Sequence, residues 1–167
     1  MTKCIRAVGP QILGIVVLAI ASVALAGCGA YMKLDGKIAR VRVVDTGAPK
    51  NVLVVEFDIT NTAKIAYVVR EAEIEVLSGS ETVKGQTVAV RDIRTICEHV
   101  ASLNHDCAAA ITPREEIAPG ETVRRLVAAS FPMSVERLNA RTGLLVRVRE
   151  LDRMETELRE SNESKKN

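Results

Sequence analysis

Residues 51–60 read NVLVVEFDIT, and this stretch decides the fold class of the chain. Apolar side chains stand at every second position, at Leu53, Val55, Phe57 and Ile59, and polar ones stand between them at Glu56, Asp58 and Thr60. A period of two is typical of an extended strand with one face toward a core and the other toward water. The stretch therefore predicts a strand of an antiparallel sheet.

The same period continues on both sides of this stretch. It is present in KIARVRVVD (37–45), AYVVREAEIEVLS (66–78), ETVKGQTVAVRDI (81–93), GETVRRLVAAS (120–130) and GLLVRVREL (143–151). The inward positions are Ala39, Val41, Val43, Ala72, Ile74, Val76, Leu144, Val146 and Val148. Charged residues between them, such as Glu73 and Glu75, are expected on exposed faces.

Turn and helix signals separate these strands. Asn61-Thr62, Ser78-Gly79-Ser80 and Pro119-Gly120 predict turns, and Gly120 suits the position of a type II turn where φ is positive. One short helix is predicted at SVERLNAR (134–141), with Ser134 as N-cap and Gly143 beyond its end. Residues 152–167 form a charged tail, for which we expect a frayed helix on Met154 and Leu158 and a disordered end.

Six to eight short strands with one helix indicate an all-β antiparallel sandwich over residues 37–151. The segment VEFDITNTAKIAYVVREAEIEV, followed by IAPGETV, resembles the immunoglobulin-like domains of bacterial envelope proteins. In that family an apolar strand ends in an Asn-containing turn, and a Pro-Gly-Glu turn opens a late strand. The resemblance implies the fold and no particular function. The sandwich of late-embryogenesis-abundant proteins is the second choice.

The first residues of the chain are typical of an export signal. Lys3 and Arg6 precede an apolar run over residues 12–26, which is shorter than the roughly 20 residues of a membrane span. The run ends in Leu25-Ala26-Gly27-Cys28, which resembles the lipobox of bacterial lipoproteins. The resemblance implies a signal peptide over 1–27, a diacylglycerol on Cys28 and further acylation of its new amino group. An uncleaved anchor helix with an incidental Cys28 is the alternative.

A lipid on Cys28 would hold the protein on the extracytoplasmic side of a membrane, because two or three acyl chains make a durable anchor. Residues 28–36 would then form a short tether that keeps the domain close to its membrane. In Gram-negative members of the lipoprotein family, an Asp after the lipidated Cys signals inner-membrane retention. Gly29 stands there instead, so we expect the outer membrane, facing the periplasm, if the envelope has one.

Composition narrows the classes of partner. Without residues 1–27 the chain keeps 140 residues, with 21 basic and 21 acidic side chains, so its formal charge is zero. A neutral domain has no electrostatic footprint for nucleic acid. The sequence contains only two Phe, two Tyr and no Trp, which also argues against an aromatic stacking platform.

One segment, CEHVASLNHDC (97–107), gathers both remaining cysteines and both histidines of the chain. If residues 100–104 form the bend of a hairpin, then Cys97, His99, His105 and Cys107 share one face. In an exported chain such a cysteine pair predicts a disulfide between Cys97 and Cys107, with no metal and no cofactor besides the covalent lipid.

Two other interpretations of the segment stay open. The two thiolates and two imidazoles could bind zinc or copper, although their spacing matches no zinc signature. Alternatively Ile96, Val100 and Leu103, at helical spacing, indicate a local helix, which would have to end near Asn104 for a disulfide to form.

The sequence carries no nucleophile elbow, phosphate loop or buried acid–base pair that we can identify, and it predicts no enzyme. The leading interpretation is a lipid-anchored, non-catalytic lipoprotein of the cell envelope that acts as a structural or protein-binding module. The partners expected are the membrane, through the lipid, and an envelope protein. A zinc- or copper-handling lipoprotein that uses Cys97, His99, His105 and Cys107 is the alternative.

Overall fold

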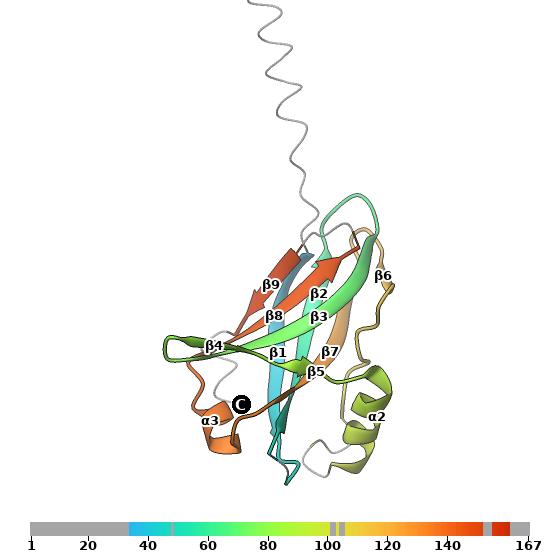
Figure 1. Ribbon diagram of the computed structural model, residues 1–167. Coiled ribbons are helices and arrows are strands. Elements are labelled where there is room, and N and C mark those ends of the chain that lie inside the picture. Colours follow the sequence, from blue (N-terminus) through green and yellow to red (C-terminus); the bar gives the residue numbers. More distant parts are fainter. Residues whose placement is uncertain (1–33, 48, 101–102, 104–105, 152–154, 161–167) are drawn as a thin grey trace, which may run out of the picture. The chain divides into compact units, whose positions relative to one another are not determined.

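The computed structural model describes residues 34–47, 49–100, 103, 106–151 and 155–160 (Figure 1). In chain order the elements are β1 (Leu34–Val44), β2 (Asn51–Asn61), β3 (Tyr67–Ser78), β4 (Glu81–Lys84), β5 (Gln86–Thr87), α2 (Val90–His99), β6 (Glu116–Ile117), β7 (Thr122–Phe131), α3 (Val135–Asn139), β8 (Gly143–Glu150) and β9 (Glu155–Arg159). Neither of these helices is long and apolar enough to span a membrane. The predicted signal peptide, Cys28 and the end of the tail lie outside the described residues.

Two antiparallel sheets pack face to face and confirm the predicted sandwich (Figure 1). One sheet has the strand order β1-β2-β7-β5, and the other has the order β4-β3-β8-β9, with the two-residue strand β6 paired to the start of β3. In an immunoglobulin domain strands A, B, E and D form one sheet, and C, F and G form the other, which is extended beyond C in variable-type domains. The order seen here is the same, so the immunoglobulin-like fold is confirmed.

The main core lies between the two sheets, where the predicted inward positions of β2, β3 and β8 meet. Leu53, Val55, Phe57 and Ile59 are fully buried, as are the alternate residues Ile74, Val76 and Val146. Tyr67 is the largest fully buried side chain, and its hydroxyl donates to the carbonyl oxygen of Val148 at 3.1 Å. Burying these side chains stabilises each by roughly 1.5–3 kcal/mol relative to leaving it in water.

Buried Tyr67 predicts a loss of stability in alkali. Burial raises the pKa of its phenol to about 12, whereas an unfolded tyrosine titrates near ~10. Folding therefore favours the neutral phenol. This contribution is complete below about pH 10 and disappears as the pH rises through about 12. We expect the ultraviolet absorbance of a Tyr31→Phe variant to report a single phenol that ionises late in the native protein and near ~10 in denaturant. Ionisation at the ordinary pKa in the native protein would contradict the burial.

The outer face of the β1-β2-β7-β5 sheet is covered, which the alternating pattern did not predict. Helix α2 lies beside this sheet (Figure 1), and a second apolar cluster fills the space between them. Its buried members are Val44, Val52, Val54, Ile93, Cys97, Leu103, Leu126 and Ala128. The strand expected over 81–93 is correct for β4 and β5 but wrong from Val90 onward, because Ile93 and Cys97 lie one helical turn apart and bury together.

Of the two helices predicted after residue 131, one forms and one does not. Helix α3 forms as expected, and the Ser134 hydroxyl accepts from the backbone N–H of Arg137 at 3.3 Å. The helix predicted around Leu158 is wrong, because residues 155–159 form strand β9 beside β8. Thr156 and Leu158 point into the sandwich, and this alternation suits a strand.

The charged outer face of the β4-β3-β8-β9 sheet carries a network of ion pairs. Arg149 of β8 contacts Glu73 at 3.3 Å and Glu155 at 2.8 Å, and Lys84 contacts Glu73 at 2.6 Å. Glu73 is only 8% exposed, so the expectation that it faces open solvent is wrong. Hydrogen bonds from Arg149 lower the pKa of the Glu155 carboxyl. This ion-pair network joins β3, β4, β8 and β9 across their polar faces.

Asn61 connects two turns and strand β6 at one end of the sandwich. Its amide nitrogen donates to the carbonyl oxygens of Ile65 and Ile117, both at 2.8 Å, and its side-chain oxygen accepts from Ala63 N at 2.9 Å. Its backbone carbonyl accepts from Gly120 N at 2.7 Å, and Gly120 has a φ of 76°, which confirms the predicted turn. The Asn-containing turn and the Pro-Gly-Glu turn are therefore directly bonded.

We expect Asn61→Ala to lower the free energy of unfolding by about 2–3 kcal/mol. Asn61 is 1% exposed, so the carbonyl oxygen of Ile117 would lose its amide donor inside the protein. Urea unfolding followed by circular dichroism measures the change. Asn139→Ala, on the exposed side of α3, is the matched control and should stay within about 0.5 kcal/mol of the parent. Equal effects at the two positions would contradict the role of Asn61.

Candidate functional site: a disulfide-closed groove beside α2

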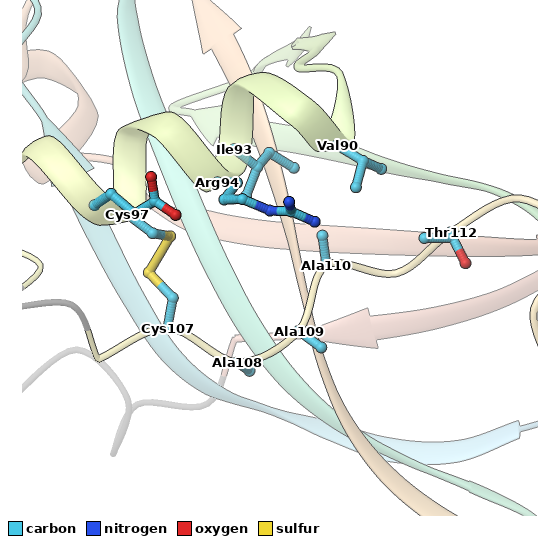
Figure 2. Close-up of a pocket in the computed structure, with 10 residues that line it drawn as sticks. Val90, Ile93, Arg94, Cys97, Cys107, Ala108, Ala109, Ala110 and Thr112 are labelled. Atoms are coloured by element: carbon cyan, nitrogen blue, oxygen red, sulfur yellow. A yellow bond between two sulfur atoms is a disulfide. The ribbon is translucent and has the colours of Figure 1, made fainter.

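Cys97 and Cys107 form a disulfide, as the sequence predicts, with their Cα atoms 6.2 Å apart. The geometry around it differs from the predicted hairpin. Cys97 lies in the last turns of α2, and Cys107 lies on the extended segment that returns along the helix (Figure 2). The hairpin is wrong because Ile93, Cys97 and Val100 follow a helical period and pack on the sheet together. The helix ends at His99, which leaves room for the bridge, as the third interpretation required.

The return segment 107–111 is held against β7 by backbone hydrogen bonds. Ile111 N donates to the carbonyl oxygen of Leu126 at 2.9 Å, and Leu126 N donates to that of Ala109 at 3.0 Å. Ala110 and Leu126 thereby form a parallel bridge. We call α2 and residues 107–111 together the cap. The cap is fixed to the sandwich by apolar packing, by these bonds and by the disulfide.

An ion pair between a partly buried arginine and a buried carboxylate lies beneath the cap. Arg42 of β1 binds the Glu56 carboxylate of β2, whose side chain is 5% exposed. The same guanidinium donates to the carbonyl oxygen of Leu103 at 3.3 Å and lies 3.6 Å from the Cys107 sulfur. Arg40 adds an exposed hydrogen bond to Asp106 at 2.7 Å, which lowers the pKa of the Asp106 carboxyl. The two arginines thus attach the segment around Cys107 to the sheet.

Two adjoining pockets open along α2 and make one groove. The first has a volume of about 370 Å³ and lies between α2 and Ala108–Ala110. The second has a volume of about 280 Å³ and reaches between the sheets to Val69, Ala72 and Val127. They share Val90, Ile93 and Thr112 as walls. Figure 2 shows the Arg94 side chain extending from α2 toward Ala110 across the first pocket.

The alternative metal site is not assembled in this geometry. Cys97 and Cys107 are bonded to each other, so neither sulfur is a free thiolate. The ring of His99 is exposed, with its Nδ1 atom 3.0 Å from the carbonyl oxygen of Thr95, and His105 lies outside the described residues. Among the residues that the structure describes, no group of three or more His, Cys, Asp or Glu side chains could hold a metal ion.

The disulfide should contribute measurably to stability. Its sequence separation is 10, and closing such a loop contributes about 2.7 kcal/mol in the chain-entropy model. We expect the double variant Cys97→Ser, Cys107→Ser to lose about 2–3 kcal/mol in urea unfolding. Reductant should bring the parent protein to the same level and leave the variant unchanged. The prediction would be contradicted if the parent protein, shown by mass to have both thiols reduced, unfolded at the same urea concentration as the oxidised protein.

The groove and its supporting ion pair were not predicted from the sequence. Part of the signal was present, because VLVV (52–55) is apolar at four consecutive positions, which is typical of a strand buried on both faces. The helical spacing of Ile93, Ile96, Cys97 and Val100 was the other part. The proximity of Arg42 to Cys107, 65 residues apart, has no counterpart in the local pattern.

Comparison with known proteins adds little to this description. No protein-family model matches the chain, and no curated protein matches it in sequence. Among solved structures, the chain is similar to a Bordetella pertussis protein described as ApaA, at 15% sequence identity and a TM-score of 0.35. The match covers 77% of this chain and 88% of the other.

Proposed function

We propose that this protein is a lipid-anchored, non-catalytic binding module of the cell envelope. The observation that carries the proposal is the groove along α2, which is lined mainly by Val, Ala and Ile and braced by the Cys97–Cys107 disulfide. A structural disulfide suits an exported chain, because the cytosol keeps thiols reduced. The lipobox Leu25-Ala26-Gly27-Cys28 supports anchoring on the extracytoplasmic side of the membrane, in the outer membrane if the envelope has one.

Anchoring is tested by Cys28→Ser with Cys4→Ser as the matched control, because Cys4 precedes the apolar run of the signal. We expect Cys28→Ser to leave the membrane fraction or to remain unprocessed. The control and the parent should both yield a mature, lipidated protein by intact mass. A mature, membrane-bound Cys28→Ser protein would overturn the lipoprotein part of the proposal.

Binding is tested separately on the full lipidated chain, extracted in mild detergent after cross-linking in cells. Ala89 lines the second pocket, so Ala89→Trp should fill the groove. A partner that is cross-linked at stoichiometric yield, and lost in Ala89→Trp, supports a binding module. Ala140→Trp, on the exposed residue that ends α3, is the control. A lack of any stoichiometric partner would leave a passive structural role and overturn the binding part.

A further inference from the structure

The groove runs beside a stretch of β3 that pairs with β8 on one edge and with no strand on the other. A groove next to a free strand edge indicates a class of partner. On its outer side β3 pairs with β6 at Tyr67 and Val68 and with β4 from Glu75 onward. Beyond those strands, Val69 bonds to residues 114 and 115, and the carbonyl oxygen of Ile74 accepts from Gly85 N at 2.9 Å. Within the described chain, no backbone bond on this side reaches Arg70–Glu73.

The direction of the free backbone groups follows from strand geometry. A residue's N–H and C=O point to the same side of its strand, and every second residue repeats that side. Since Ile74 faces Gly85, Ala72 faces the same edge. Ala72 also lines the second pocket, so its N–H donor and C=O acceptor lie on the strand edge beside which a chain in this pocket would run.

One basic side chain lines the groove, and two others are next in sequence to residues that line it. Arg94 lines the first pocket, and Arg70 and Arg114 lie next to each other because Arg114 N donates to the carbonyl oxygen of Val69 at 2.7 Å. All three are exposed, and the described part of the chain offers none of them an ion-pair partner within 4.0 Å. Two acidic residues line the groove, Glu71 and Glu98. The charge of Glu71 is balanced by Arg149 at 3.0 Å, so Glu98 is the acidic lining residue with no ion pair in the described part of the chain.

We propose that the groove binds an extended acidic peptide of a partner protein, which adds a short strand to β3 between β6 and β4. The backbone of the peptide would pair with Ala72, and its apolar side chains would enter the two pockets, whose volumes are about 370 and 280 Å³. Its carboxylates would meet Arg70, Arg94 and Arg114. Main-chain pairing at a sheet edge supplies affinity, and the side-chain pockets supply specificity. This inference rests on the proposed binding function and names its partner.

The test uses the full lipidated chain in detergent and a fluorescent synthetic peptide in which Ala and Val alternate with Glu. We expect saturable binding by anisotropy, and about tenfold weaker binding for Ala89→Trp but not for Ala140→Trp. The double variant Arg70→Glu, Arg94→Glu should also bind about tenfold more weakly, with a smaller salt dependence. Its control is Lys37→Glu, Lys64→Glu, which makes the same charge change elsewhere on the surface.

A second peptide, N-methylated at alternate amides, isolates the strand pairing because it keeps the side chains and loses the backbone donors. We expect it to bind at least about tenfold more weakly, and we expect hydrogen exchange at the amide of Ala72 to slow only with the unmodified peptide. Equal binding of both peptides, or no saturable binding, would overturn the inference. If a cross-linked partner is insensitive to Ala89→Trp, the groove is not its binding site. The general binding role would still stand.

Discussion

Glu160→Gln is expected to lower the free energy of unfolding by about 3–5 kcal/mol. Glu160 follows β9, and its carboxylate accepts from Arg141 Nε at 3.1 Å, with a second bond from the same guanidinium. The two side chains are 1% and 7% exposed. The amide would deprive the buried Arg141 guanidinium of the negative charge of Glu160, which is far costlier than losing an exposed pair.

Two comparisons decide whether burial is the cause. Glu81→Gln breaks the pair that Glu81 makes with Arg137, whose side chains are 61% and 53% exposed, and it should cost less than about 1 kcal/mol. Replacing both buried partners, by Arg141→Met with Glu160→Leu, should restore most of the loss because no charge stays buried. Urea unfolding measures all three. A loss below about 1 kcal/mol for Glu160→Gln would contradict the prediction. A loss of several kcal/mol would be easy to measure, because the total free energy of unfolding of such a domain is only about 5–15 kcal/mol.

Arg42→Met is expected to lower the free energy of unfolding by about 3 kcal/mol and to loosen the cap first. Arg42 is the close ion partner of buried Glu56, because Arg40 approaches that carboxylate only to 3.9 Å. It also bonds to the carbonyl oxygen of Leu103, so its loss detaches the segment before Cys107 from the sheet. The amide of Ile111 in the cap and the amide of Val100, which is bonded to Ile96 of α2, should exchange hydrogen faster than those in the centre of β2.

Arg124→Met is the control for this prediction. Arg124 pairs with Asp58 at 2.7 Å on the same sheet, but its side chain is 56% exposed. We therefore expect an effect below about 1 kcal/mol and no change in the exchange of the cap amides. If Arg42→Met and Arg124→Met behave alike, the pair of Arg42 with Glu56 does not hold the cap. If Arg42→Met also weakens peptide binding at the groove, the cap and the groove act as one unit.

The parts of the fold that follow local rules could be predicted. Alternation at Leu53–Ile59 and Leu144–Val148 predicted strands and their inward faces, and Ser134 predicted the start of α3. Gly120 predicted a turn with positive φ. These features depend on neighbouring residues alone, through side-chain period, capping and backbone sterics. The same rules misled at Leu158, where a short apolar spacing fits a strand as well as a helix.

The candidate site was predicted only in part. The Cys97–Cys107 bridge followed from the count of cysteines in a chain whose first residues predict an export signal. The hairpin around it did not form, because the apolar positions of α2 are buried against the sheet, and the local sequence holds both strand and helix periods. The edge of β3 depends on where β4 and β6 stop pairing, which no single segment contains.

By itself the sequence determined the sandwich, the turn at Pro119-Gly120, the short helix α3 and the cysteine pair. Tertiary structure alone decided that α2 covers the outer face of β2, that Arg42 pairs with buried Glu56 beneath the cap, and that a groove opens beside β3. The physical reason is range. Period and turn chemistry act over a few neighbouring residues, whereas burial and a free sheet edge arise only when distant segments pack together.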